Sequence, residues 1–502
     1  MKPFIAWVRK NRLEVAIIVL IFFMAAFMRF YNLSGYMTFL GDEGRDAIII
    51  KQILVDHNLP FIGPPTSVGN IYLGPFYYYM MAVSETFFWL NPVAAAGMVA
   101  GIGVATVFLV YYLARRWFGF LPAVLAASLY AISPINIIYS RSSWNPDPAP
   151  FFALLAILGI YQARESRNFR WFILTGVSLA AALQMHYLAM ILIPILGLLW
   201  LYELVVTKTK NYRNFWTSTL GAVLAFILIM LPLVLFDFKH NFLNFKAMTS
   251  LFFGGGNSVG FSFSSTLGRV PAIFNNLLIE RYIGGQTDFI GYTVSVLVLL
   301  TLGFAIWKKF TKERVSWPYF ALGTWLVLGI IGISLYRQQI YDHYLGFVNP
   351  APFLLLGGLV SFLKGRKQLA LMLVLLLTLG IFNIAKSPLQ YSPNNQLQRT
   401  QEIAKFIITE SGNKPFNFAL LAEHNYDSAY QYYLDIYGHK PKVVPDEITD
   451  QLFVVCEDVV CNPVGSPKYE IAAFGWAKVE NRWQVLGVKV YKLVPNPTGK
   501  PS

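Results

Sequence analysis

The chain of 502 residues is 56% hydrophobic and only 13% charged, with a mean hydropathy of +0.51. A soluble protein of this length carries roughly twice that charged fraction, so a soluble globular enzyme is excluded. The net charge of +14 does not by itself indicate nucleic acid, because Lys and Arg stand in short clusters between apolar runs. The composition predicts a polytopic helical membrane protein, since a β-barrel would show alternating strands.

Several apolar runs reach the ~20 residues needed to cross the hydrocarbon core of a bilayer. In chain order the runs lie near residues 13–30, 73–90, 93–114, 119–139, 149–163, 171–186, 188–206, 215–237, 289–307, 317–335, 344–363 and 368–385. The first run is too long for the apolar part of a cleavable signal, and no small-residue cleavage site follows it. We therefore expect it to be the first span.

Clusters of cations between the runs set the orientation. They are Lys2/Arg9/Lys10/Arg12, Arg115/Arg116, Arg164/Arg167/Arg170, Lys208/Lys210/Arg213, Lys308/Lys309/Lys312/Arg314 and Lys364/Arg366/Lys367. If every run spans, the later clusters fall on the side opposite the N-terminal cluster. If one run before Arg115 does not span, all of them share one face, as the excess of cations in cytoplasmic loops requires.

The run that fits least well as a span is 73–90, "LGPFYYYMMAVSETFFWL". It has Pro75 near its start, Glu85 inside it, and Tyr and Trp side chains suited to the headgroup region. We expect an interfacial or re-entrant helix here, which leaves about eleven spans; a true span with an unusual topology is the alternative. The N-terminus is then cytoplasmic, and residues 31–92, 140–148, 238–288, 336–343 and the tail from about 388 lie outside.

Residues 1–387 are therefore expected to form a transmembrane domain, and residues 388–502 a small extracytoplasmic α/β domain. In this tail, helical periodicity ends at Gly412 and again at Gly438, both natural helix stops. Strands are predicted in "FNFALLA", "QLFVVCE", "YEIAAFGWAKVE" and "WQVLGVKVYKLV", with the last two joined as a hairpin around Glu480–Asn481.

Both cysteines of the chain, Cys456 and Cys461, lie in "FVVCEDVVCNP" within this tail. A pair with this spacing in an oxidising compartment favours a disulfide. A zinc site is the weaker interpretation, because two Cys without a nearby His are half of a tetrahedral ligand set.

Four polar groups share the predicted outer face. They are "GDEGRDA" with Asp42 and Glu43, "YSRSSWNPDPAPFF" with Arg141 and Asp147, "LQMHYLAM" with Gln184, His186 and Tyr187, and "LYRQQIYDHYLGFVNPAPFLL" with Arg337, Asp342, His343 and Tyr344. Each alone has an ordinary explanation as a solvated carboxylate, an interface anchor or a snorkelling arginine. Together they place cations beside carboxylates at bilayer depth, on a face that is otherwise poor in cations. Such a grouping indicates a binding or catalytic site.

The chemistry of these groups fits transfer from a lipid phosphate. Arg and His donors stabilise the charge of a phosphate headgroup. A neighbouring carboxylate can take a proton from an attacking hydroxyl, and phosphate leaves once its charge is stabilised. These parts predict glycosyl transfer from a lipid-phosphate sugar.

The order of motifs resembles a known family. "GDEGRDA" after the first span, "LGPFYYYMMA", "YYLARRWFG" and "SPINIIYSRSSWNPDP" follow one another as in the integral-membrane GT-C glycosyltransferases. The later "HYLGFVNPAPFLLLGG" is similar to the branch that contains protein O-mannosyltransferases and bacterial aminoarabinose transferases. The resemblance covers roughly residues 10–385 and implies a polyprenyl-phosphate monosaccharide as donor.

The resemblance also assigns roles. It implies that Asp42 is the general base, with Glu43 beside it, and that Asp147 lines the site. From the residues themselves, Arg141, Arg337 and His343 are expected to hold the lipid phosphate, with His186, Tyr187 and Tyr344 as wall residues. Arg281 and Tyr282 belong to the segment 238–288, which is either a lid whose residues reach the phosphate or a packing loop.

The prediction is thus an inverting glycosyltransferase, multi-pass in the cytoplasmic membrane, that acts on its outer face upon a protein, glycolipid or cell-wall acceptor. No metal is required, although Asp42, Glu43 and Asp147 could hold a divalent cation. The main alternative is a transporter or flippase for a sugar or lipid-linked sugar, for which ionisable groups inside spans or an internal repeat would be expected. An aspartyl protease needs both Asp within spans, and a ligase of whole oligosaccharides shares this topology. Sugar, acceptor and oligomeric state are left open.

Overall fold

The computed structural model describes residues 8–66, 71–206, 212–253, 263–310, 316–458 and 460–496. Several features expected from the sequence lie outside these ranges: Lys2, Lys208, Lys210, Lys312, Arg314 and the glycine-rich centre of the segment 238–288. The chain forms two compact units. Unit 1 contains Met1–Tyr31, Pro60–Met81 and Ala96–Ser392, and unit 2 contains Asn32–Leu59, Ala82–Ala95 and Pro393–Ser502.

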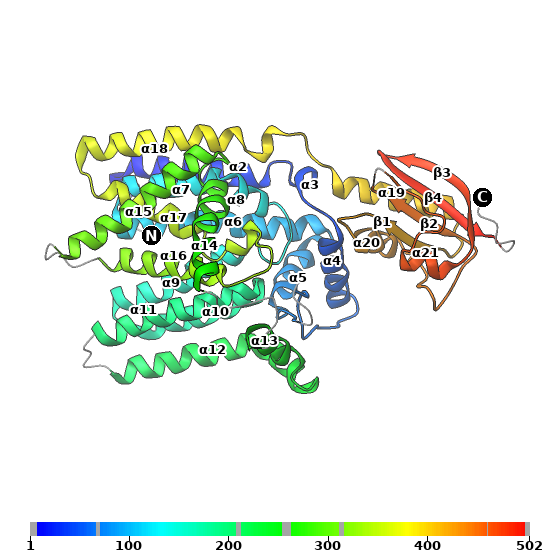
Figure 1. The fold of residues 1–502 in the computed structure, drawn as a ribbon, viewed down its shortest axis with the longest axis horizontal. Coiled ribbons are helices and arrows are strands. Elements are labelled where there is room, and N and C mark those ends of the chain that lie inside the picture. The colour runs from blue at the N-terminus through cyan, green and yellow to red at the C-terminus, as the bar shows by residue number, and fades with distance from the viewer. Residues whose placement is uncertain are drawn as a thin grey trace. The chain divides into compact units, whose positions relative to one another are not determined.

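Unit 1 is helical (Figure 1). The longer helices that lie in it, wholly or for most of their length, are α2 (Arg12–Phe30), α6 (Pro92–Phe118), α7 (Phe120–Ile132), α9 (Ala149–Ser166), α10 (Phe172–Met185), α11 (Leu192–Val206), α12 (Tyr212–Lys239), α13 (Leu243–Phe253), α14 (Phe263–Ala272), α15 (Asp288–Phe310), α16 (Trp317–Ser334), α17 (Pro350–Ser361) and α18 (Gly365–Ala385). The shorter ones are α8 (Pro134–Tyr139), the 3-10 turns η1 (Phe169–Trp171), η2 (Tyr187–Ile191), η4 (Asp342–Leu345) and η5 (Pro388–Gln390), and the π-helix η3 (Ile273–Glu280).

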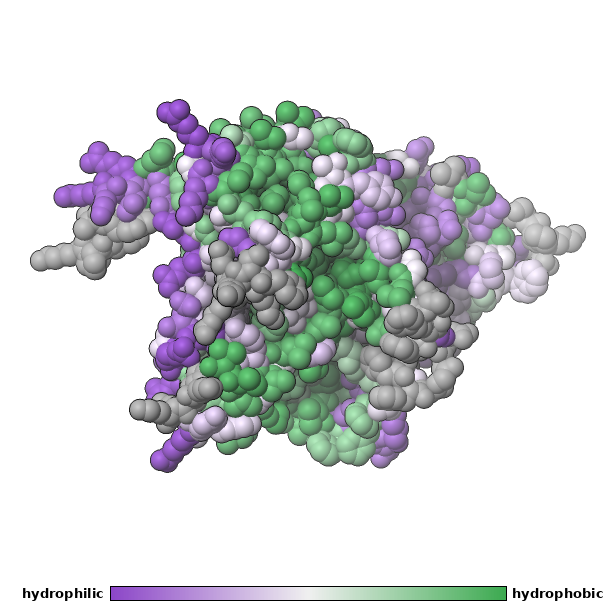
Figure 2. All heavy atoms as spheres, turned by 60° about the vertical axis from the view of Figure 1, so that its left-hand side comes forward, coloured by the Kyte–Doolittle hydropathy of each residue, from purple (hydrophilic) through white to green (hydrophobic). Residues whose placement is uncertain are grey.

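Within the described residues, seven helical segments are long and apolar enough to cross a bilayer. They are Arg12–Phe30, Pro92–Phe118, Tyr187–Val206, Tyr212–Lys239, Asp288–Lys308, Trp317–Ser334 and Gly365–Ala385. Much of this apolar surface is not covered by protein: only 6% of the most apolar stretch of α12 is buried. Figure 2 shows hydrophobic residues across the helical part of the surface, as lipid contact requires. The count of about eleven spans stays a prediction.

The helix α5 (Phe76–Phe88) has 13 residues, which is about 20 Å of helix. The hydrocarbon core is ~30 Å thick, so α5 alone is too short to cross it. Gly74, just before it, admits the side chain of Gln184: a Cβ on this glycine would meet Gln184 Oε1 at 2.1 Å. That oxygen accepts a hydrogen bond from the Phe76 amide at 3.0 Å and so holds the start of α5.

Proline sets the helix boundaries near the polar loops of unit 1. Pro134 follows Ser133, whose extended backbone ends α7 and begins α8, because a residue before proline is kept out of the helical region. Pro350 likewise stands at the start of α17. Since proline lacks the N–H that a first helical turn leaves unpaired anyway, these motifs are helix starts.

Unit 2 joins the acidic first loop to the C-terminal α/β part. Its elements are α3 (Leu33–Tyr36), α4 (Gly41–Leu54), α19 (Gln396–Ser411), β1 (Asn417–Leu421), α20 (Ser428–Ile436), β2 (Leu452–Cys456), α21 (Tyr469–Phe474), β3 (Ala477–Val485) and β4 (Val488–Pro495). The sheet order is β1-β2-β4-β3, with β1 and β2 parallel and the other pairs antiparallel. The domain boundary expected at residue 387 stays a prediction.

Two local predictions for the tail were wrong. The segment "YEIAAF", expected in a strand, is the helix α21, which ends at Gly475 with a positive φ of 93°. The hairpin turns at Leu486–Gly487, both with positive φ, and not at Glu480–Asn481, which lie within β3. The left-handed backbone of a tight hairpin turn is the conformation that glycine adopts without strain.

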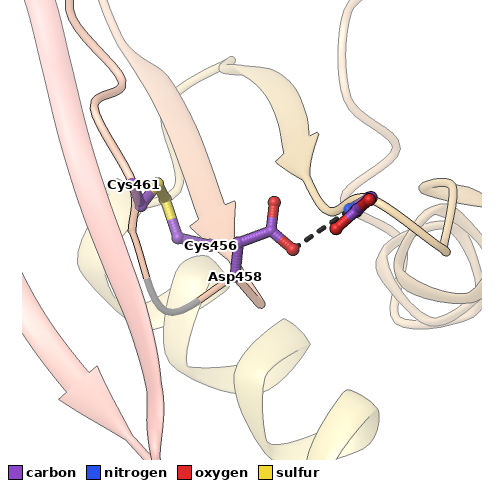
Figure 3. The surroundings of a disulfide bond; sticks show 4 residues. Cys456, Asp458 and Cys461 are labelled. Atoms are coloured by element: carbon purple, nitrogen blue, oxygen red, sulfur yellow. Dashed lines mark hydrogen bonds between the residues drawn. A yellow bond between two sulfur atoms is a disulfide. The ribbon is translucent and has the colours of Figure 1, made fainter.

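The favoured pairing of the cysteines is confirmed, because Cys456 and Cys461 form a disulfide (Figure 3). Cys456 ends the buried strand β2, and it lies in an apolar core with Leu452, Val454 and Leu493. The bond therefore ties the loop that follows β2 to the interior of the sheet.

Candidate functional site

A buried carboxylate, Asp342, organises the polar loops of unit 1. Arg281 Nε lies 2.7 Å from its Oδ2, and the Tyr139 hydroxyl donates a hydrogen bond to its Oδ1. The Tyr282 hydroxyl donates to the main-chain oxygen of Asp342 at 3.0 Å. We call Tyr139, Arg281, Tyr282 and Asp342 the Asp342 cluster. It brings together the end of α8, the residues after η3 and the first residue of η4.

The Asp342 cluster presents a cation. Arg281 directly follows the π-helix η3, a form of helix often found at functional sites. Its side chain is 44% exposed, whereas that of Asp342 is 9% exposed. Within the described residues only Nε of the guanidinium has a partner, so its two terminal nitrogens are open to an anion. The Asp342 carboxylate thus orients the Arg281 guanidinium, whose two terminal nitrogens have the geometry to bind a phosphate.

Next to this cluster, four predicted residues form an aromatic wall. The ring of His186 lies 4.7 Å from that of Tyr187, 4.6 Å from that of Tyr344 and 6.1 Å from that of His343. Tyr187 also donates a hydrogen bond to the Tyr336 hydroxyl at 2.8 Å. The structure therefore brings His186, Tyr187 and Tyr344, which were expected as wall residues, together with His343, which was expected at the lipid phosphate; these roles stay predictions.

Both histidines of the wall are neutral at pH 7. Burial, with a smaller effect of His343, lowers the pKa of His186 to about 3. Burial lowers the pKa of His343 to about 4, against the opposing effect of Asp342. The Nδ1 of His186 accepts a hydrogen bond from the Leu188 amide at 3.2 Å, so the ring proton belongs on Nε2. His186 can thus donate one neutral hydrogen bond.

Asp147 lines a cavity in unit 1 together with polar and aromatic side chains. The lining includes Tyr130, Asn136, Tyr139, Asp147, Tyr282, His343 and Asn349. Three of these residues, Tyr139, Tyr282 and His343, also belong to the cluster or the wall. The cavity therefore continues the site toward the carboxylate that was predicted to line it.

Two predicted phosphate ligands, Arg141 and Arg337, differ in burial. Arg141 is 2% exposed, and its guanidinium donates to the carbonyls of Met28 at 2.7 Å and Tyr31 at 2.5 Å, at the end of α2. These bonds cap carbonyls that the helix leaves unpaired. Arg337 is exposed, and no ion pair is found for it within the described residues. Their role as phosphate ligands stays a prediction.

In unit 2, the first turn of α4 carries the acidic pair. Asp42 is 40% exposed and lies 2.7 Å from Arg45 Nη1, which also pairs with the buried Asp46 at 2.6 Å. Glu43 points the other way: its Oε2 accepts a hydrogen bond from the Leu40 amide at 3.0 Å, as in a capping box. Burial raises the pKa of Glu43 to about 7. Asp42 is thus the presented member of the pair.

Several residues of these sites were not singled out from the sequence. Tyr139 and Trp144 stand on either side of Arg141, in the same motif, and Trp144 packs its ring 4.4 Å from His343. Their aromatic character beside a predicted site was the available signal. Tyr426, whose hydroxyl donates to Asp42 Oδ1, is 384 residues away in the chain and gave no signal.

Metal ligation has no support from clustered side chains in the part of the chain that the structure describes. No group of three or more His, Cys, Asp or Glu residues there is placed to hold a metal ion. Binding of a divalent cation by Asp42, Glu43 and Asp147 stays a prediction.

Comparison with known families gives one match within the membrane part. Residues 73–235 match the model of the dolichyl-phosphate-mannose-protein mannosyltransferase family. A comparison with curated proteins gives no match.

Comparison with solved structures extends over nearly the whole chain. The crystal structure of ArnT from Cupriavidus metallidurans bound to undecaprenyl phosphate aligns over 97% of this chain and 98% of that chain, with a TM-score of 0.61 and 16% identity. The Archaeoglobus fulgidus oligosaccharyltransferase AglB, in complex with an inhibitory peptide and a dolichol-phosphate, aligns over 88% and 65%, with a TM-score of 0.52 and 14% identity.

At these identities the likeness shows the fold. The chain has the fold of the GT-C integral-membrane glycosyltransferases, and the resemblance predicted from its motif order is confirmed. With its apolar helices and small C-terminal sheet, it is a multi-pass membrane protein of the same architecture as ArnT.

Proposed function

We propose that the protein is an inverting glycosyltransferase that moves one sugar from a polyprenyl-phosphate donor to an acceptor hydroxyl on the extracytoplasmic face of the membrane. The observation that carries the proposal is the Asp342 cluster, in which a buried carboxylate directs an open guanidinium outward. In the related fold, ArnT is seen with undecaprenyl phosphate and AglB with dolichol-phosphate. A lipid phosphate is therefore the anion we assign to Arg281.

The reaction divides between the two kinds of site. Asp42 takes the proton of the acceptor hydroxyl, and the acceptor oxygen bonds to the anomeric carbon. The bond from that carbon to the phosphate oxygen breaks, and the lipid phosphate leaves with the electron pair. Arg281 and the neutral Nε2–H of His186 stabilise its charge. Because the displacement is a single step, the anomeric configuration inverts.

Asp147 and the aromatic wall serve the sugar. Tyr187, Tyr282, His343 and Tyr344 give flat surfaces and neutral hydrogen-bonding groups, which suit a sugar ring and the first units of a prenyl chain. Asp147, on the cavity wall, accepts hydrogen bonds from sugar hydroxyls. Whether the acceptor is a protein, a glycolipid or a cell-wall polymer is decided by experiment.

The test is a transfer assay with purified protein, a panel of polyprenyl-phosphate monosaccharides and a membrane extract as acceptor. Release of polyprenyl phosphate and labelling of the extract are measured together. Asp42→Asn should lower turnover by at least about 1,000-fold, while the control Asp56→Asn, an exposed aspartate of the same loop, keeps it. Wild-type turnover in Asp42→Asn would remove Asp42 from the mechanism. Uptake of a lipid-linked sugar into liposomes without any transfer product would favour a transporter or flippase.

A further inference from the structure

The first turn of α4 lies directly against the segment that leads into α20. A Cβ on Gly41 would meet the Tyr426 ring at 2.5 Å, and one on Gly44 would meet the Ala429 backbone nitrogen at 2.2 Å. Neither glycine has a positive φ. The two glycines of "GDEG" are therefore explained by close approach, since any side chain there would push the two segments apart.

Hydrogen bonds fix this contact at the backbone. The Gly41 amide donates to Asn425 Oδ1 at 2.9 Å, and Asn425 Nδ2 donates to Glu457 Oε2 at 2.9 Å. The next residue, Asp458, accepts from the Glu423 amide at 3.0 Å, a bond drawn in Figure 3 beside the disulfide. Glu457 and Asp458 directly follow Cys456, and through these two hydrogen bonds they anchor the segment 423–426.

The same segment reaches the side chain of Asp42. The Tyr426 hydroxyl donates to Asp42 Oδ1, and Arg45 Nη1 donates to that same oxygen at 2.7 Å. Burial and the bond to Asp42 raise the pKa of the Tyr426 hydroxyl, which keeps it protonated as a donor. Within the described residues no hydrogen bond is found to Oδ2. The carboxylate is therefore held through Oδ1, and Oδ2 is left available.

We propose that Tyr426 is a positioning residue for the general base: it holds Oδ1 of Asp42 so that Oδ2 faces the acceptor hydroxyl and takes its proton. This inference rests on the role of Asp42 in the proposed function. It makes the C-terminal α/β part a component of the catalytic apparatus, because that part supplies the donor and the framework that holds it.

The hydroxyl of Tyr426 is not needed to dock the segments. Lys51 Nζ lies 2.5 Å from Asp435 Oδ2, and the ring of Phe39 packs against those of Tyr432 and Tyr433 at 6.2 and 5.5 Å. These contacts join the acidic loop to α20 independently. Tyr426→Phe keeps the ring that covers Gly41. It removes the hydrogen bond to the Asp42 carboxylate and the longer bond, of 3.3 Å, that the hydroxyl accepts from Arg45 Nη1.

The experiment compares purified wild-type protein with Tyr426→Phe in the transfer assay above, with Tyr469→Phe on the exposed face of α21 as the matched control. We expect kcat of Tyr426→Phe to fall about tenfold, the effect of one hydrogen bond to a charged group. The KM for the lipid donor and the melting temperature should stay unchanged, and Tyr469→Phe should match wild type. Wild-type kcat, or a loss of kcat that follows a lower melting temperature, overturns the inference.

A second variant separates positioning from general damage. In an Asp42→Glu background the carboxylate is displaced by one methylene. The Tyr426 hydroxyl, if it acts only through Asp42, then no longer contributes to catalysis. Tyr426→Phe should then cost less than twofold in that background, whereas an independent effect would again cost tenfold and contradict the inference. If Asp42→Asn itself retains wild-type turnover, the proposed function fails. If Asp42→Asn is inactive but Tyr426→Phe retains wild-type turnover, the role of Tyr426 is refuted and the proposed function is not.

Discussion

The two units each contain an arginine, an aspartate and a tyrosine hydroxyl bonded together, yet they present opposite charges. In unit 1 the aspartate of the set, Asp342, is 9% exposed and its partner Arg281 is 44% exposed. In unit 2 Asp42 is 40% exposed and Arg45 is 20% exposed. Both Arg–Asp contacts measure 2.7 Å. Exposure, and not the set of residues, therefore decides whether such a triad presents a cation or a carboxylate.

The largest expected effect concerns an arginine that belongs to neither triad. Arg141→Met should lower the free energy of unfolding by about 4 kcal/mol, because the buried guanidinium is lost and two carbonyls at the end of α2 lose a charged donor. Thermal unfolding in detergent measures this, with the exposed Arg337→Met as control. A stable Arg141→Met protein that has lost donor binding would return Arg141 to the phosphate site.

The cation that unit 1 presents is tested next. Arg281→Gln should lower kcat/KM for the lipid-phosphate donor about 100-fold, or roughly 2.7 kcal/mol, since a charge-assisted contact to phosphate is lost. Arg337→Gln serves as the comparison, because it removes an arginine that has no ion pair within the described residues. An equal or larger loss in Arg337→Gln would move the phosphate contact to that residue.

The smallest effect concerns Glu43, the buried neighbour of Asp42. Its folded pKa of about 7 lies above the ordinary 4.5, so the folded state favours the protonated carboxyl. The stability this gives is complete below pH 4.5 and is lost as the pH rises through 7. Between pH 5 and pH 7 the protein should therefore lose about 2 kcal/mol of unfolding free energy.

Glu43→Gln keeps an acceptor for the Leu40 amide and cannot ionise, so it should remove most of this pH dependence while transfer activity persists. Melting temperatures of the two proteins across pH 5–7 supply the measurement. A pH dependence identical to that of wild type would show that Glu43 is not the group that titrates, and an inactive variant would place Glu43 in the chemistry.

The fold could be predicted from the sequence because apolar run length and cation placement act locally along the chain. The histidine and tyrosine residues of "MHY" and "DHY" were singled out for a similar reason, since both motifs stand directly at helix ends. Arg141 and Arg281 could not be told apart in this way. Each lies near a carboxylate in sequence, and only packing decides that one guanidinium meets helix carbonyls while the other meets Asp342.

The remaining errors have similar causes. The position of the C-terminal hairpin turn depends on the positive φ of Leu486 and Gly487, and the pairing of strand residues across it selects that site over Glu480–Asn481. The partner of Asp42 required a contact across 384 residues, for which a single sequence holds no local pattern.

The length of that contact bears on how the protein is made. The hydroxyl that grips Asp42 and the amide oxygen that holds Gly41 leave the ribosome only after the helices of unit 1 up to α18 have been synthesised. A nascent chain arrested between α18 and α19 would carry its membrane-embedded helices but lack the partners of its acidic turn. Biosynthesis thus delays assembly of the acidic turn until most of the chain has been translated.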